Sequence, residues 1–216
     1  MPTGETGAAD HHRAAQARGE LWARLADWLS FPGADFIAAF EAGDIATEAR
    51  RLVDALAYPF PYPLPLDAEA LATGDPAEVE VEFIRLFDVP SGGAPVSLYG
   101  GVHGGDRRQV MEELLRFYRH FGLSVANAPE RDLPDAIPTV LEFLSFLCVG
   151  EAEAADSEAV ETFRTAQRDI LERHLTRWMP AIAGRLAKKD PMPLYRSLID
   201  LLGHFAAAEH AALAST

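Results

Sequence analysis

Apolar residues recur at helical spacing through most of this chain, whereas the alternation typical of strands is scarce. Leu21, Leu25 and Leu29, for example, fall on one face of a helix. Proline and glycine separate such segments, as Pro32-Gly33 does after the first of them. The pattern therefore predicts an all-α fold, a single irregular helical bundle of about nine helices.

The same pattern predicts where the helices begin and end. Asp44, Asp75 and either Asp156 or Ser157 are suited to cap helix N-termini, and Gly122 is suited to follow a C-terminus. Pro180 is expected to start a short helix. The predicted helices cover about residues 12–30, 34–42, 44–57, 67–73, 75–87, 107–121, 135–150, 157–177, 180–187 and 194 onward.

Three stretches lack this periodicity. Residues 1–10 are small and polar, and we expect them to be disordered ahead of one all-helical domain that covers residues 11–216. Prolines alternate with apolar residues over 59–66, which predicts an extended connector packed on the core. Residues 88–106 are rich in glycine and proline and are interpreted as a functional loop, in which glycine gives the backbone freedom.

The formal net charge of −14 at pH 7 limits the kinds of partner. So acidic a chain lacks the basic face of a nucleic-acid-binding protein, and anionic membranes repel it. The charge suits a basic partner, or solubility alone. The first 19 residues hold no apolar signal core, and no run of about 18 apolar residues is present. These features predict a cytoplasmic protein without direct membrane insertion.

No residue pattern is typical of a catalytic or metal site. Cys148, the only cysteine, falls in an apolar run and is predicted to be a buried, unreactive thiol. The seven histidines include no pair at the i, i+4 spacing of helical zinc sites. His103 lies in the glycine-rich loop, where packing or contact with a partner is favoured over catalysis. We therefore expect a protein that is not an enzyme and has no metal or cofactor of its own.

Two carboxylates bear most directly on function. Asp135 and Glu142 are seven residues apart, which places them on one helix face at a separation of about 10 Å. Such a pair could be the acid and base of a hydrolase. Alternatively, Asp135 could cap its helix while Glu142 pairs with an arginine. Both could also form a surface for a basic peptide, because arginine binds carboxylates through directional hydrogen bonds.

Three segments, taken in order, resemble a known family. Residues 82–87 read E-F-I-R-L-F and are similar to the motif E-x-x-x-L-F. Residues 97–107 read S-L-Y-G-G-V-H-G-G-D-R and are similar to S-L-x-x-x-E-H-V-H-G-x-x-x-x-R. Residues 133–144 read L-P-D-A-I-P-T-V-L-E-F-L and are similar to L-P-D-H/Y-L-P-x-x-L-E-F/Y-L. Ala136 and Gly100-Gly101 depart from these motifs, so the side-chain contacts that relatives make there are not expected here.

On these segments the chain resembles the TorD/DmsD/NarJ superfamily of molybdoenzyme assembly chaperones. Within it, the chain is most similar to the chaperones of nitrate reductase and of the type II dimethyl sulfoxide reductase family, which includes the dimethylsulfide, ethylbenzene, selenate and chlorate enzymes. The resemblance implies an all-helical, non-enzymatic chaperone. Such proteins bind the N-terminal segment of a molybdopterin oxidoreductase catalytic subunit, often a twin-arginine signal or its remnant. They hold the apo-subunit for cofactor insertion before export or assembly.

The resemblance also implies a peptide-binding site and leaves the molybdenum cofactor to the partner subunit. We expect the site between the helix 75–87, the glycine-rich loop and the helix 135–149, because an apolar groove with acidic residues suits an arginine-bearing peptide. The candidate residues are Phe87, Leu98, Tyr99 and His103 for packing, Asp135 and Glu142 for charge, and Glu82 and Asp88 as further acidic contacts.

Two other classes of function stay open from the sequence. One is a helical hydrolase-type enzyme, and the other is a simple oligomerisation or interaction module. A monomer is expected, while a domain-swapped dimer stays open because the proline connector and the glycine-rich loop could let elements exchange.

Overall fold

The computed structural model describes residues 4–60, 75–88, 93–124 and 133–215, and across these residues the all-α prediction is confirmed. The helices are α1 (Gly4–Trp28), α2 (Ala34–Glu41), α3 (Asp44–Asp54), α5 (Pro76–Phe87), α6 (Arg107–His120), α7 (Ile137–Glu153), α8 (Ser157–Ile170), α9 (Thr176–Leu186) and α10 (Pro193–Ala214). Shorter helical turns are η1 (Gly100–Val102), η2 (Leu171–Leu175) and η3 (Ala187–Lys189).

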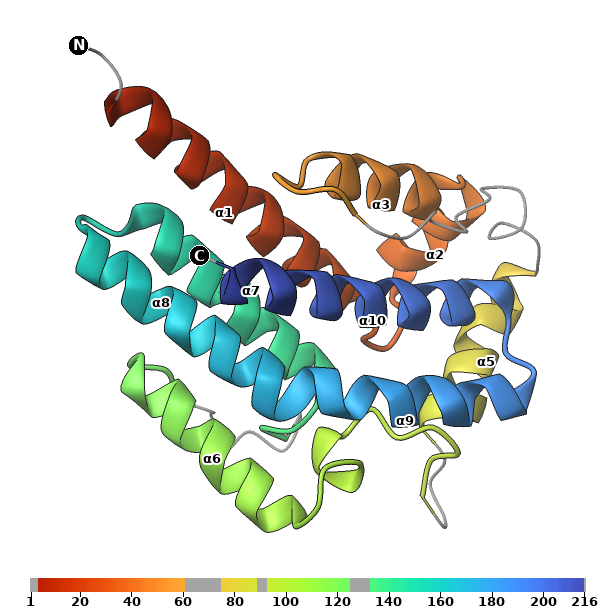
Figure 1. Cartoon of the computed structure of the whole chain (residues 1–216). Coiled ribbons are helices and arrows are strands. Elements are labelled where there is room, and N and C mark those ends of the chain that lie inside the picture. Colours follow the sequence, from red (N-terminus) through yellow and green to blue (C-terminus); the bar gives the residue numbers. More distant parts are fainter. Residues whose placement is uncertain (1–3, 61–74, 89–92, 125–132, 216) are drawn as a thin grey trace.

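The core is built around α1, α7 and α10. α1 packs along α7, and Gly19 permits the close approach because a Cβ atom there would lie 3.1 Å from the Cβ of Cys148. The ring of Trp22 on α1 lies 4.1 Å from that of Phe205 on α10. Cys148 is fully buried, as predicted, and burial raises the pKa of its thiol. α6 lies along the outer side of α8 (Figure 1), and its buried face joins the core, where the ring of Tyr118 lies 4.8 Å from that of Phe143 on α7.

Most helix ends follow from local sequence signals. The side chains of Asp75 and Asp156 accept hydrogen bonds from the backbone N–H groups of Ala77 and Ala159, both at 2.9 Å. Gly122 has a φ of 75°, the left-handed conformation that glycine adopts after a helix. The predicted caps of α5 and α8 are thus confirmed. Asp44 is instead the first residue of α3, where the capping position is Gly43.

Two predicted boundaries are wrong. α1 begins at Gly4, so residues 4–10, which were expected to be disordered, belong to a helix. Pro180 lies inside α9 and does not start a helix. The π-helical turn η2 directly precedes α9, and a wide turn of this kind is where a helix can absorb a proline that lacks its N–H donor. The predicted helix 67–73 and most of the proline connector lie outside the described residues.

A search of the described helices found none that combines the length and the apolar character needed to cross a membrane.

Candidate functional site

The glycine-rich loop is fastened to the start of α7 by backbone hydrogen bonds. The N–H of Gly100 donates to the carbonyl of Asp135 at 2.7 Å, and the N–H of Ile137 donates to the carbonyl of Leu98 at 2.8 Å. Tyr99 and Ala136 form an isolated antiparallel bridge between these contacts. The structure thus brings together Leu98, Tyr99 and Asp135, as predicted, and it does so through main-chain pairing.

Asp135 lies at the centre of this junction with a fully buried side chain. Its Oδ2 atom accepts hydrogen bonds from the Nε of Arg107 at 3.0 Å and from the N–H of Gly101 at 3.2 Å. The guanidinium carbon of Arg107 also lies 5.1 Å from the ring centre of Tyr99. The prediction that Asp135 caps α7 is wrong, since the capping position is Ala136. Asp135 instead joins the loop, α6 and α7.

The loop glycines divide between two roles. Gly105 has a φ of 103° and uses the backbone freedom that was predicted, whereas Gly100, Gly101 and Gly104 serve close packing. A Cβ atom on Gly100 would lie 2.3 Å from the ring of Trp178, and one on Gly104 would lie 2.5 Å from its Nε1. A Cβ on Gly101 would lie 2.5 Å from the Cγ of Arg107. None of these three glycines has a positive φ. They are required because Trp178 and Arg107 press against the main chain.

The remaining predicted site residues divide by exposure. Phe87 and Leu98 are buried, and the ring of Phe87 lies 5.5 Å from that of Tyr195 in the core. Glu82 is also buried and accepts hydrogen bonds from Arg85 at 2.6 Å and from the N–H of Met192 at 3.0 Å. Burial raises the pKa of Glu82, but these hydrogen bonds outweigh it, so the pKa lies below its usual value.

Only part of the predicted groove therefore faces solvent. Glu142 and Asp88 are exposed, and Tyr99 and His103 are half-buried. The Nε2 of His103 lies 2.8 Å from the carbonyl oxygen of Ser97, and burial lowers the pKa of the imidazole. Because Asp135 is enclosed and Glu142 is exposed, the two carboxylates do not share one open face. Peptide binding by these residues stays a prediction.

Sequence reasoning missed a set of buried polar side chains, here called the central polar network. Arg18 of α1 donates to Glu151 of α7 at 2.7 Å and to Glu209 of α10 at 3.5 Å. Gln167 of α8 donates to Glu151 at 2.7 Å, and the hydroxyl of Tyr58 donates to Glu209 at 2.6 Å. Burial raises the pKa of Glu209, while Arg18 and Tyr58 oppose that shift. The network joins the four helices around the core.

A signal for this network was present in the helical period. Arg18 precedes Leu21 and Trp22 by three and four residues, so it lies on the apolar face of α1. Glu209 follows Phe205 by four residues in the same way. A charged residue at a core position is expected to be buried and paired, because an unpaired buried charge is costly.

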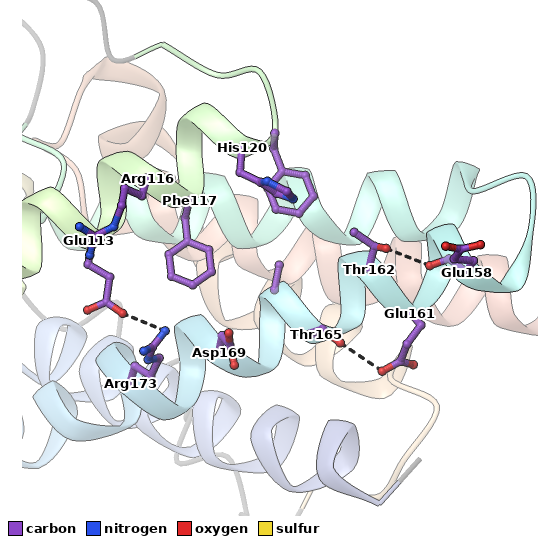
Figure 2. Close-up of a pocket in the computed structure, with 12 residues that line it drawn as sticks. Glu113, Arg116, Phe117, His120, Glu158, Glu161, Thr162, Thr165, Asp169 and Arg173 are labelled. Carbon is purple, nitrogen blue, oxygen red and sulfur yellow. Dashed lines mark hydrogen bonds and ion pairs between the residues drawn. The ribbon is translucent and has the colours of Figure 1, made fainter.

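The second missed feature is a cleft of about 820 Å³ between α6 and α8, here called the α6–α8 cleft. Figure 2 shows side chains from both helices directed toward it. The residues that line it are Glu113, Arg116, Phe117 and His120 from α6, Phe121 just after α6, Glu158, Glu161, Thr162, Thr165, Ala166 and Asp169 from α8, and Arg173 from η2.

The cleft has an apolar floor and charged edges. Phe117 and Phe121 are half-buried, and Ala166 is buried. At one end, Arg173 pairs with Glu113 at 3.0 Å and joins the two helices (Figure 2). At the other end, the ring of Phe121 lies 5.4 Å from that of Phe163. Apolar surface and convergent polar groups of this kind are typical of ligand sites.

The described residues contain no group of three or more His, Cys, Asp and Glu side chains that could hold a metal ion.

Comparison with known proteins gives one matching family, described as the nitrate reductase delta subunit, over residues 41–184. The selenate reductase assembly chaperone protein of Thauera selenatis is 41% identical over 115 residues, which are 52% of this chain and 59% of that protein. The perchlorate reductase assembly chaperone protein of Dechloromonas aromatica (strain RCB) is 32% identical over 194 residues, which are 88% of this chain and 86% of that protein.

The nitrate reductase molybdenum cofactor assembly chaperone NarJ of Escherichia coli (strain K12) is 37% identical over 91 residues, 41% of this chain and 34% of that protein. The match with the Thauera protein thus spans little more than half of that relative, whereas the match with the Dechloromonas protein spans most of both chains.

Proposed function

The chain belongs to the nitrate reductase delta subunit family, and we propose that it is an assembly chaperone for a molybdenum-containing oxidoreductase. The observation that carries this proposal is the 32% identity to a perchlorate reductase assembly chaperone across 88% of this chain. Relatives named for selenate, chlorate and nitrate reductases support the same role. In this proposal the protein binds and does not catalyse.

The partner in this proposal is the catalytic subunit of that oxidoreductase. The chain binds its N-terminal segment, a twin-arginine signal or its remnant, and holds the apo-subunit in the cytoplasm until its cofactor is inserted. The molybdenum cofactor belongs to the partner and is not held by this chain. The charge of −14 supports this partner, because an acidic surface speeds the approach of a segment rich in arginine.

The structure weakens the hydrolase alternative. That alternative needed Asp135 and Glu142 as a facing acid and base, but Asp135 is enclosed and bound to Arg107 and Gly101. A carboxylate with a guanidinium partner and no access to solvent cannot exchange protons with a substrate at a surface.

The experiment is a calorimetric titration with N-terminal peptides from the molybdenum oxidoreductase catalytic subunits of the same organism, at low and high salt. We expect saturable 1:1 binding to one peptide, weakened by salt because exposed charges are screened. Co-purification with each intact apo-subunit is the companion measurement. The proposed function would be contradicted if the protein bound none of the peptides and none of the apo-subunits.

A further inference from the structure

The α6–α8 cleft lies between two helices that run in opposite directions. Glu113 of α6 pairs with Arg173, beyond the end of α8, whereas Phe121 after α6 contacts Phe163 near the start of α8. The lining on the α8 side extends from Glu158 to Arg173, which is about 22 Å at 1.5 Å per residue. A trough of this length between two antiparallel helices can take a third helix of about 15 residues.

The apolar floor of the cleft continues beyond its lining as an aromatic strip, because Phe121 also contacts Phe163 and Phe146, which do not line the cleft. Phe121 contacts Phe163 at 5.4 Å and Phe146 at 6.4 Å between ring centres, and Phe146 is 38% exposed. Gly150 lets Phe163 lie close to α7, because a Cβ there would lie 2.3 Å from the ring. The strip therefore runs from Phe117 across Phe121 toward the exposed side of α7.

The α8 edge of the cleft is acidic. Glu158 is exposed and Asp169 is partly exposed, and neither has an ion-pair partner in the described part of the chain. Glu161 accepts weak contacts from Thr165 at 3.2 Å and from Arg168 at 3.4 Å, and it stays exposed. Carboxylates without partners beside an apolar strip are complementary to an amphipathic helix with basic residues.

A buried imidazole lies behind the Arg173 end of the cleft. His174 is 2% exposed, and neither of its ring nitrogens has a hydrogen-bond partner among the described residues. Its Nε2 lies 3.7 Å from the Oε2 of Glu113, the residue that lines the cleft and pairs with Arg173. His174 lies in η2, a π-helical turn, and such turns are frequent at functional sites.

We infer that the α6–α8 cleft binds a basic amphipathic helix, with the apolar face of that helix on Phe117 and Phe121 and its basic residues on Glu158 and Asp169. The inference rests on the proposed function for the identity of the occupant, which is the arginine-bearing N-terminal segment of the partner subunit. It places that segment on α6 and α8, away from the groove that the sequence motifs suggested.

The test uses a synthetic peptide of about 15 residues, with leucine at i, i+3, i+4 and i+7 positions and arginine on the opposite face. Binding to the full chain is measured by calorimetry at low and high salt. The same peptide with glutamate in place of arginine is the charge control. We expect the basic peptide to bind with 1:1 stoichiometry and the acidic peptide not to bind.

Two variants locate the peptide. Thr162→Trp places a bulky side chain in the cleft at an exposed position and should weaken binding at least about tenfold. Glu158→Gln with Asp169→Asn should weaken it about fivefold at low salt and less at high salt. Asp35→Asn with Glu41→Gln on α2 removes the same charge elsewhere and should leave binding unchanged.

The inference is overturned if the wild-type chain fails to bind the basic peptide, or if both cleft variants bind it as tightly as the α2 control does. The proposed function is judged separately, by the binding of the natural N-terminal peptide or the apo-subunit. If those partners bind wild type and Thr162→Trp equally, the function stands and the cleft assignment fails. Melting curves of each variant show whether it is folded.

Discussion

The central polar network and the α6–α8 cleft both contain carboxylates and arginines and share helix α8, but their surroundings differ. In the network, Arg18 donates hydrogen bonds to Glu151 and Glu209, and all three side chains are buried. In the cleft, Glu158 and Asp169 lie beside aromatic side chains without an ion-pair partner in the described part of the chain. The first arrangement holds helices together, whereas the second leaves charge available to another molecule.

The comparison shows that burial and pairing decide what a charged residue does here. A buried charge that loses its partner destabilises the fold strongly, because the remaining charge stays out of water. An exposed charge contributes little to folding and can be changed at small cost. The two regions should therefore respond in opposite ways to the same kind of substitution.

The largest expected effect is on the network. Glu151→Ala removes the acceptor of both Arg18 and Gln167 and leaves a buried guanidinium without its short contact. We expect the free energy of unfolding to fall by about 3–5 kcal/mol. Urea denaturation measures it. Glu158→Ala, on the exposed edge of the cleft, is the control and should change it by less than about 0.5 kcal/mol. Equal losses in the two variants would refute the distinction.

Asp135 is expected to stabilise the fold, as the residues of the central polar network do. Asp135→Ala leaves the N–H of Gly101 without its acceptor and removes the partner of Arg107, which is itself partly exposed. The expected loss is about 2–3 kcal/mol in the free energy of unfolding. Glu142→Ala, seven residues further along the chain and exposed on α7, should melt like wild type. An Asp135→Ala variant of wild-type stability would show that the junction does not depend on this carboxylate.

A smaller effect is expected from the loop glycines. Gly100→Ala puts a methyl group 2.3 Å from the ring of Trp178 and should destabilise by about 1–3 kcal/mol. Gly184→Ala lies in α9, where a Cβ would meet nothing within 4 Å, and should stabilise by up to about 1 kcal/mol. Thermal melting compares the two. A neutral Gly100→Ala would mean that the loop shifts easily off Trp178.

The smallest expected effect is on how the stability of the fold depends on pH. Burial lowers the pKa of His174 below its ordinary value of 6.5, against the attraction of Glu113, while Arg173 and Arg177 lower it further. The folded state then binds fewer protons than the unfolded state just below pH 6.5, so stability falls as the pH drops through that range. His103 acts in the same direction.

The His174→Gln variant should therefore lose less stability than wild type as the pH is lowered. The midpoint of urea denaturation, measured at several pH values, tests this. A slope equal to that of wild type would show that His174 is not buried as a neutral imidazole.

The helices could be predicted from the sequence because each one carries its own signals. Apolar spacing places Leu194, Leu198 and Phe205 in the core, and Asp75 marks the start of α5 through its own side chain. The prediction that Pro180 starts a helix is wrong because the effect of this proline depends on η2, a turn that local sequence does not reveal.

The site could be predicted only in part because burial of a residue depends on what covers it. The spacing predicts Asp135 and Glu142 on one helix face, but Asp135 lies before α7, and local sequence does not show that the loop from Leu98 to Gly104 encloses it. The α6–α8 cleft is built from residues far apart in the sequence, such as Glu113 and Arg173, so no local motif describes it. The central polar network could have been predicted, because its charged residues fall at positions where the helical spacing expects apolar ones.

The partner segment is expected to bind between α6 and α8, and amide hydrogen exchange with and without the bound N-terminal peptide tests this most directly. We expect added protection in residues 113–121 and 158–173, with none in α3. Protection confined to α5 and the first turns of α7 would contradict it and would return the binding site to the groove that the sequence motifs suggested.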